Sequence, residues 1–162
     1  MNFKKLNTLT GWFVFAIATS VYLMTMESTA SLWDCGEYIT AAYKLEVGHP
    51  PGAPLFMVLG RLFSFFAAPD SVALWINALS AVSSSLTILF MFWSMSLLLK
   101  KLVQTQKGEL GKSDGIMVLV ASGVAALAYT FSDSFWFSAV EGEVYAMASL
   151  FTAVIFWAAL KW

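Results

Sequence analysis

Four long apolar stretches restrict this chain of 162 residues to a small number of folds. Charged residues make up 12% of the sequence, whereas an ordinary soluble domain carries about 25%. The mean hydropathy is +0.75. Since a helix of about 20 apolar residues crosses the hydrocarbon core of a bilayer, the sequence predicts an all-α integral membrane protein. Nucleic acid is not an expected partner.

The predicted helices fall into two classes by length. Four transmembrane helices are expected at residues 9–26, 72–99, 116–132 and 144–161. Two shorter segments, about 33–47 and 54–68, are predicted to be interfacial helices, because runs of this length more often lie along a membrane than across it. Ser31 is the expected N-cap of the first of these.

The ends of the chain leave two points to decide. A cleaved signal peptide is the alternative to the first span, since a basic start, an apolar middle and small residues at 28–30 fit a cleavage site. A retained helix is favoured because further spans follow it.

The chain stops without a helix cap or polar tail, so residues 1–162 are expected to be the N-terminal part of a longer transmembrane domain.

The lysines predict which loops face which side of the membrane. If segment 54–68 is interfacial, the lysines at both chain ends and in the basic, turn-rich loop 100–115 all face the cytoplasm. Only Lys44 and Arg61 then face outward, which satisfies the positive-inside rule. If the same segment spans the membrane, loop 100–115 is exported. We therefore expect residues 27–71 and 133–143 outside.

Charge, histidine and proline collect in one stretch, Leu32–Pro54. Asp34 and Glu37 lie three residues apart, so on a helix they share a face and influence each other's pKa. His49, the only histidine in the sequence, stands in a Gly48–Pro54 turn that prolines and glycines make stiff. A solvated helix face is the plain alternative for the two acids, but the adjacent histidine favours a functional site.

The remaining candidates are weaker when taken singly. Glu141 and Glu143 are expected to approach the Asp34 helix from a second outer loop, although an ordinary exposed acidic loop is the alternative. Cys35 is alone in the chain and fits a small buried hydrophobe. The sequence contains no zinc, calcium or phosphate-loop motif, so no metal site or cofactor is assigned. A divalent cation is compatible with the acidic pair, but nothing in the sequence indicates one.

Three motifs together resemble a known class of enzymes. They are Trp33-Asp34-Cys35-Gly36-Glu37, the turn His49–Pro54, and the start of a span at Ala73–Val82, ALWINALSAV. This order resembles the first outer loop of the GT-C class of membrane glycosyltransferases. It is most similar to a multi-pass family whose vertebrate members O-mannosylate receptor ectodomains, and more distantly to the protein O-mannosyltransferases. The resemblance covers essentially the whole chain and implies a GT-C-like N-terminal helical bundle.

The resemblance also implies an activity and its partners. The enzyme would move a sugar, mannose by analogy, from a polyprenyl-phosphate carrier to serine or threonine of an exported protein, with inversion. Asp34 would be the general base, and Glu37 would be a second catalytic residue. The substrate-binding residues would be His49, Arg61, Glu141 and Glu143. The expected setting is the inner membrane of a bacterium with the site facing outward, and the secretion machinery is a further expected partner.

A non-enzymatic multi-pass protein is the rival interpretation. A transporter segment should carry ionisable residues or broken helices at membrane depth, whereas the acids of this chain lie between the apolar runs. A factor associated with the export machinery is the second form of this alternative. We rank both below the transferase.

Overall fold

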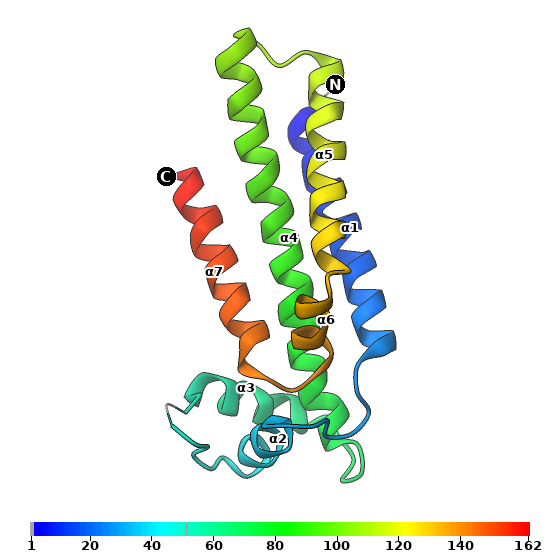
Figure 1. The fold of residues 1–162 in the computed structure, drawn as a ribbon, viewed down its shortest axis with the longest axis vertical. Helices are drawn as coiled ribbons and strands as arrows, with labels where there is room; N and C mark the ends of the chain where they lie inside the picture. The colour runs from blue at the N-terminus through cyan, green and yellow to red at the C-terminus, as the bar shows by residue number, and fades with distance from the viewer. Residues whose placement is uncertain (1, 51) are drawn as a thin grey trace.

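The computed structural model describes residues 2–50 and 52–162 and contains helices joined by short loops. Figure 1 shows the long helices side by side, with short helices lying across one end of the bundle. In chain order the helices are α1 (Phe3–Thr25), α2 (Cys35–Lys44), α3 (Pro54–Ser64), α4 (Val72–Lys107), α5 (Lys112–Thr130), α6 (Asp133–Val140) and α7 (Val144–Lys161). The prediction of an all-α membrane protein is confirmed.

Helix α4 is the centre of the bundle and contacts all six other helices. Its buried face is rich in serine and alanine, and Ser84, Ser85 and Ala81 are fully buried. Small side chains of this kind let neighbouring helices approach closely within a membrane. Larger residues, among them Ile88 and Phe92, fill the space between α4 and α1.

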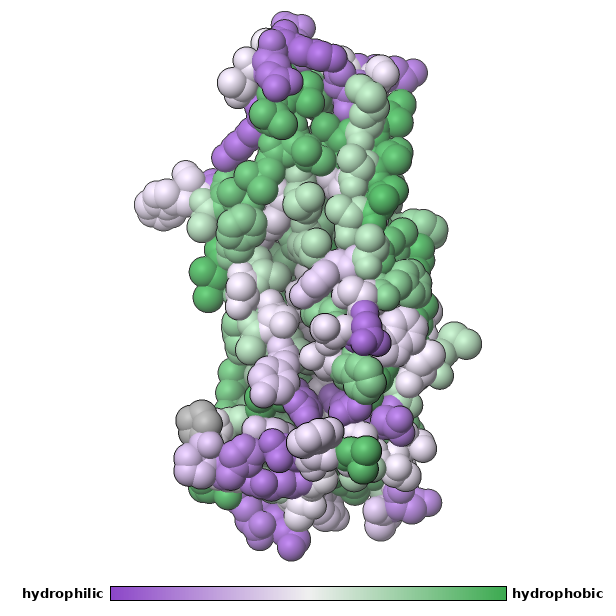
Figure 2. Space-filling view, viewed as in Figure 1, coloured by the Kyte–Doolittle hydropathy of each residue, from purple (hydrophilic) through white to green (hydrophobic). Residues whose placement is uncertain are grey.

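Four helices are long and apolar enough to cross a membrane, namely α1, α4, α5 and α7. Figure 2 shows a largely apolar belt between two polar ends. Helix α4, with 36 residues, rises about 54 Å at 1.5 Å per residue and so extends beyond a hydrocarbon core of about 30 Å. The N-terminus and the loop after α4 lie at one end, and α2 and α3 lie at the other.

Helix α1 is integrated into the bundle. The Tyr22 side chain is fully buried, and its hydroxyl donates to the Thr130 carbonyl on α5 at 2.9 Å. Its ring also packs edge-on against Phe135 and Trp136 of α6. These contacts favour the retained helix over the cleaved signal peptide.

The interfacial helices differ in detail from the predicted segments. Helix α3 has 11 residues and would rise only about 16 Å, too little to span. Helix α2 begins at Cys35 after Asp34, so Ser31 is not its cap, and the Ser31 hydroxyl has no hydrogen-bond partner. Leu45 ends α2 in the left-handed region with φ 55°.

Two loops predicted from composition contain helix. Residues 100–107 continue α4 because they include no glycine or proline until Gly108, so the loop to α5 is short. Residues 133–140 form α6, and Phe135 is a core residue packed on Tyr129. Eight residues are too few to show a helical period in sequence.

Candidate functional site

Asp34 occupies the N-cap position of α2, but its carboxylate is not used for capping. The residue before it, Trp33, has φ 65° and is 92% exposed, so the chain turns sharply as it enters the helix. The Asp34 side chain is 60% exposed. The Asp34 carboxylate therefore faces solvent at the end of the bundle that carries α2 and α3.

Glu37 and His49 are joined by two contacts across the loop that follows α2. The His49 backbone N–H donates to Glu37 Oε1 at 2.6 Å, and His49 Nδ1 lies 3.1 Å from Glu37 Oε2. The backbone N–H lowers the pKa of the Glu37 carboxyl below its ordinary value, and the ring lowers it further. Glu37 therefore stays ionised and holds the histidine in place.

The same contacts aim the other nitrogen of His49 toward Asp34. An ionised carboxylate only accepts hydrogen bonds, so Nδ1 carries the proton in its contact with Glu37. His49 Nε2 lies 3.9 Å from Asp34 Oδ2. The structure thus brings together the three residues that the sequence analysis placed in one constellation.

The Tyr38 ring packs against the His49 ring, and the sequence analysis did not single out this tyrosine. Its ring lies 5.7 Å from the imidazole and 5.9 Å from the Phe56 ring of α3, and the residue is 8% exposed. Burial raises the pKa of the Tyr38 hydroxyl, and the negative charges of Asp34 and Glu143 raise it further. Tyr38 lies one helical turn after Asp34 in the sequence, and this spacing could have predicted that it lies beside the site.

The buried face of α2 packs against α3 and α4 and so fixes the position of the site at this end of the bundle. Cys35, Tyr38, Ile39, Ala41 and Ala42 are buried at helical spacing, which is the pattern of an amphipathic helix. The aromatic residues Trp33 and Tyr43 lie off this face and are exposed.

Asn77 is a second residue that sequence reasoning undervalued. It is fully buried in α4, and its Nδ2 donates to the backbone carbonyls of Glu27 and Thr29 at 2.8 and 3.1 Å. The Cys35 thiol lies 4.0 Å from Asn77 Oδ1. Asn77 therefore anchors the segment that leads from α1 into α2. A polar amide within an otherwise apolar span could have predicted this role from the sequence.

Glu143 approaches the site from the other outer loop. Burial raises the pKa of its carboxyl above the ordinary value, and the nearby carboxylates of Glu141 and Asp34 add to the rise. Ser80 of α4 hydrogen-bonds the Glu143 backbone at 3.3 Å in both directions. Both Glu141 and Glu143 are half-buried.

Gly142, between these two acids, shows how tightly this loop packs on α4. A Cβ atom added there would lie 2.7 Å from Asn77 Oδ1. The Asn77 side chain and the acidic loop are therefore in close contact.

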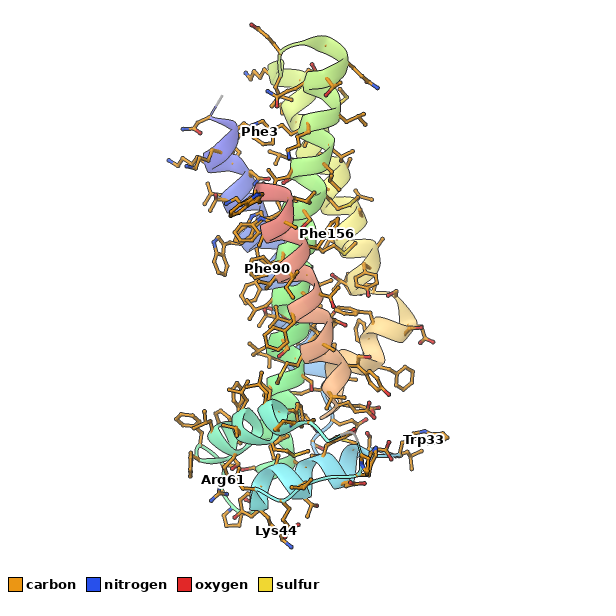
Figure 3. The ribbon with its side chains drawn as sticks, turned by 90° about the vertical axis from the view of Figure 1, so that its left-hand side faces the viewer. Phe3, Trp33, Lys44, Arg61, Phe90 and Phe156 are labelled. Atoms are coloured by element: carbon orange, nitrogen blue, oxygen red, sulfur yellow. The ribbon has the colours of Figure 1, made fainter. Side chains whose placement is uncertain are left out.

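Arg61 lies away from the site. Its guanidinium packs 4.9 Å from the ring centroids of Tyr43 and Phe65. Tyr43 is nine residues after Asp34, which corresponds to about 14 Å along α2. Figure 3 shows Arg61 and Trp33 at opposite sides of this end of the molecule. The expectation that Arg61 binds substrate stays a prediction.

Comparison with known proteins identifies the family. A family model described as the Protein O-mannosyl-transferase TMEM260 N-terminal domain matches residues 34–162. The chain belongs to this family. The match begins at Asp34, so it includes every residue of the site described above.

Two relatives carry the same name. The Protein O-mannosyl-transferase tmem260 of Dictyostelium discoideum is 30% identical over 144 residues, covering 88% of this chain and 16% of that protein. Its Mus musculus counterpart is 30% identical over 142 residues, covering 88% of this chain and 18% of that protein. The chain therefore spans less than a fifth of the length of these relatives. No solved structure matches it significantly.

The TMEM260-family site could offer ligands to a cation. One atom each of Asp34, Glu37 and His49 lies within 4.8 Å of the others, and all three residues are exposed. His49 Nδ1 already contacts Glu37 Oε2 at 3.1 Å, so a cation bound by Glu37 would compete with this contact.

The His49 turn is described except at one position. Pro51, which belongs to the predicted stiff turn Gly48–Pro54, lies outside the described residues. The structure describes the other residues of that turn. The Gly52 backbone N–H donates to the His49 carbonyl at 2.8 Å, which closes the turn. A Cβ at Gly48 would lie 3.2 Å from Glu37 Oε1, so the backbone passes close to that carboxylate.

Proposed function

We propose that this protein is a GT-C type glycosyltransferase that moves a sugar from a polyprenyl-phosphate carrier to serine or threonine of exported proteins. Both relatives are named protein O-mannosyl-transferases, which supports mannose as the sugar. The observation that carries the proposal is the solvent-exposed Asp34 carboxylate, which lies 3.9 Å from His49 Nε2 at the α2 end of the bundle.

Asp34 is the general base in the proposed reaction. It takes the proton of the acceptor hydroxyl while the oxygen attacks the anomeric carbon from the side opposite the carrier phosphate. The bond between that carbon and the phosphate oxygen breaks, and its electron pair leaves with the lipid phosphate. Attack from the opposite side inverts the anomeric configuration. General-base help of this kind is typically worth about 10²–10⁴-fold in rate.

The neighbouring residues have separate tasks. Glu37 orients His49 through the backbone and ring contacts, so it acts as a positioning residue. When the His49 ring carries a proton on both nitrogens, Nε2 can donate to Asp34 or to the departing phosphate. Burial and the carboxylates of Glu141 and Asp34 raise the pKa of the Glu143 carboxyl above its ordinary value, and we place this residue at the edge of the substrate site.

The transporter alternative gains no support from the helices. Each of the four long helices is continuous, and their charged residues lie in the terminal turns, as with Lys4, Lys5 and Lys161. A transport pathway usually needs ionisable groups or broken helices at membrane depth.

The cellular setting is proposed in coarse form. The apolar helices make the chain an integral membrane protein, and we propose that the α2 end faces away from the cytoplasm. The two relatives are eukaryotic, so they lend no support to a bacterial inner membrane. The proposed partners are the lipid-linked donor and an exported acceptor, and no comparison supports the secretion machinery.

The test is a reconstituted reaction with the complete protein in vesicles. The donors are polyprenyl-phosphate mannose, polyprenyl-phosphate glucose and a nucleotide-activated mannose, each offered with an exported acceptor domain. The proposal expects transfer from the polyprenyl-phosphate donor and a product whose anomeric configuration is opposite to that of the donor. Transfer from the nucleotide sugar alone, or a product with retained configuration, would show the proposal to be wrong.

A further inference from the structure

At the end of the bundle opposite the site, α1, α4 and α7 enclose a cavity of about 380 Å³. Its polar rim carries Lys4, Lys100 and Lys161, one from each helix, and Trp93 and Trp157 form its apolar side. Figure 3 shows Phe3, another lining residue, at this end of the molecule near the last turns of α7.

The charge of this cavity is uncompensated in the described part of the chain. No aspartate or glutamate lines it. The ion pairs formed by residues 2–50 and 52–162 involve only His49 and Lys107 as cations, so the three rim lysines have no acidic partner there. Three positive charges around one space attract an anion to it.

The aromatic residues hold two of these lysines at the rim. Lys100 Nζ lies 5.5 Å from the centroid of the Phe3 ring, and Lys161 Nζ lies 4.3 Å from that of Trp157. The Trp93 and Trp157 rings are 5.8 Å apart. Cationic heads above tryptophan rings are typical of the boundary between lipid and water.

An amide side chain also lies in the wall of the cavity. Asn7 is one of the lining residues, and its Oδ1 is buried with no hydrogen-bond partner among residues 2–50 and 52–162. An asparagine Nδ2 can donate to a phosphate oxygen.

We propose that this cavity binds the phosphate group of an anionic membrane lipid. Basic pockets between transmembrane helices are the typical sites for such headgroups. A free phosphate ion would use only the lysine rim. A lipid also uses the apolar side, because its acyl chains continue along Trp93 and Trp157 toward the hydrocarbon. The site is separate from Asp34 and does not depend on the proposed transferase activity.

The sequence offers a matched control for the test. Lys5 and Lys101 are the direct neighbours of Lys4 and Lys100 but do not line the cavity, and neither does Lys112. The cavity variant is Lys4→Gln/Lys100→Gln/Lys161→Gln. The control variant, Lys5→Gln/Lys101→Gln/Lys112→Gln, removes the same charge from the same end of the molecule.

The measurement is native mass spectrometry of the complete protein titrated with phosphatidylglycerol, phosphatidylcholine or inorganic phosphate. A lysine near an anionic headgroup contributes about fivefold in binding constant, so three should contribute about 100-fold. We expect one tightly bound phosphatidylglycerol per protein, a loss of at least about tenfold in the cavity variant, and a change below about twofold in the control variant. A variant with arginine at the three cavity positions should keep binding.

Four results would overturn the proposal. Equal losses in the cavity and control variants would mean diffuse attraction to basic residues. Displacement of the lipid by inorganic phosphate at equal concentration would mean a free-anion site. Unchanged lipid binding in the cavity variant, or no preference for phosphatidylglycerol over phosphatidylcholine, would mean that something else occupies the space.

Discussion

The pairing of Glu37 with His49 is the residue-level feature on which the order of the site depends. The carboxylate accepts from both the backbone N–H and the ring of the same residue, so it fixes the loop and the imidazole together. This contact was only partly predictable. The sequence placed Glu37 and His49 in one stretch, but twelve residues separate them, and neither spacing nor charge predicts that the histidine folds back onto the helix.

Removing the Glu37 carboxylate should release His49. We expect Glu37→Ala to increase hydrogen exchange in residues 45–50 and to reduce sugar transfer. Glu37→Gln should have a smaller effect on both, since its carbonyl can still accept the His49 backbone N–H. Hydrogen exchange with mass spectrometry and the transfer assay measure the two effects. Glu46→Ala, an exposed acid in the same loop, is the control and should change neither, whereas equal exchange in Glu37→Ala and wild type would contradict the clamp.

This clamp should also respond to pH in a defined direction. The folded pKa of Glu37 lies below its unfolded value of 4.5, so its contribution to stability is fully present above pH 4.5 and is lost as the pH falls through the folded pKa. Slow exchange of the His49 amide at neutral pH is therefore the expected state.

Glu143 should show the opposite dependence. Burial raises its folded pKa above the unfolded value of 4.5, so its favourable contribution is present below pH 4.5 and is lost as the pH rises through the folded pKa. Glu143→Gln removes the free-energy cost of burying the ionised carboxylate. The apparent melting temperature of this variant should therefore exceed that of wild type at pH 8 but not at pH 4. Scanning fluorimetry in detergent measures the difference. A lower melting temperature for the variant at pH 8 would mean that the Glu143 charge is compensated.

At the scale of elements, the close crossing of α2 and α3 sets the position of the site. A Cβ atom at Gly60 would lie 2.9 Å from the Ala42 Cβ, which is anchored to the backbone and cannot move aside. Gly60→Ala should therefore push α2 away and cost about 1–3 kcal/mol through overpacking. Gly123, in α5, has open space around its Cβ position.

The matched pair Gly60→Ala and Gly123→Ala tests this packing. The first should lower the apparent melting temperature and weaken transfer, because α2 carries Asp34. The second should leave both unchanged or slightly raise stability, since alanine is a better helix former than glycine. If the two variants behave alike, the crossing of α2 and α3 is looser than the structure shows.

The same scale shows what sequence patterns could and could not predict. The long apolar helices follow from composition, because a span needs only length and hydrophobicity. Helix α6 and the continuation of α4 to Lys107 did not follow, since both carry polar or aromatic residues that are equally common in loops. The first turn of α2 was misplaced because Asp34, rather than Ser31, precedes the helix.

For the whole molecule, the arrangement of helices predicts two faces with different charge. The ends of α1, α4, α5 and α7 that carry most lysines lie together, away from α2 and α3. The positive-inside rule then places Gln106 in the cytoplasm and Asp70 outside. Single cysteines at these positions, in a Cys35→Ser background, report the sidedness. An impermeant thiol reagent applied to intact cells should label position 70 and not position 106, and the reverse pattern would contradict the topology.

The central claim is that Asp34 takes the acceptor proton. The direct measurement is the rate of sugar transfer from polyprenyl-phosphate donor to an exported acceptor by the complete protein, wild type against Asp34→Asn. Asparagine keeps the size and shape of the side chain but cannot serve as a base. Asp70→Asn, the same change at another exposed outer-loop acid, is the control. Both variants should fold and insert as wild type does, since exposed substitutions usually change stability by about ±0.5 kcal/mol or less. We predict that Asp34→Asn slows transfer by about 10²-fold or more while Asp70→Asn transfers at the wild-type rate. Transfer by Asp34→Asn at the wild-type rate would contradict the assignment of the base and, with it, of this loop as the catalytic centre.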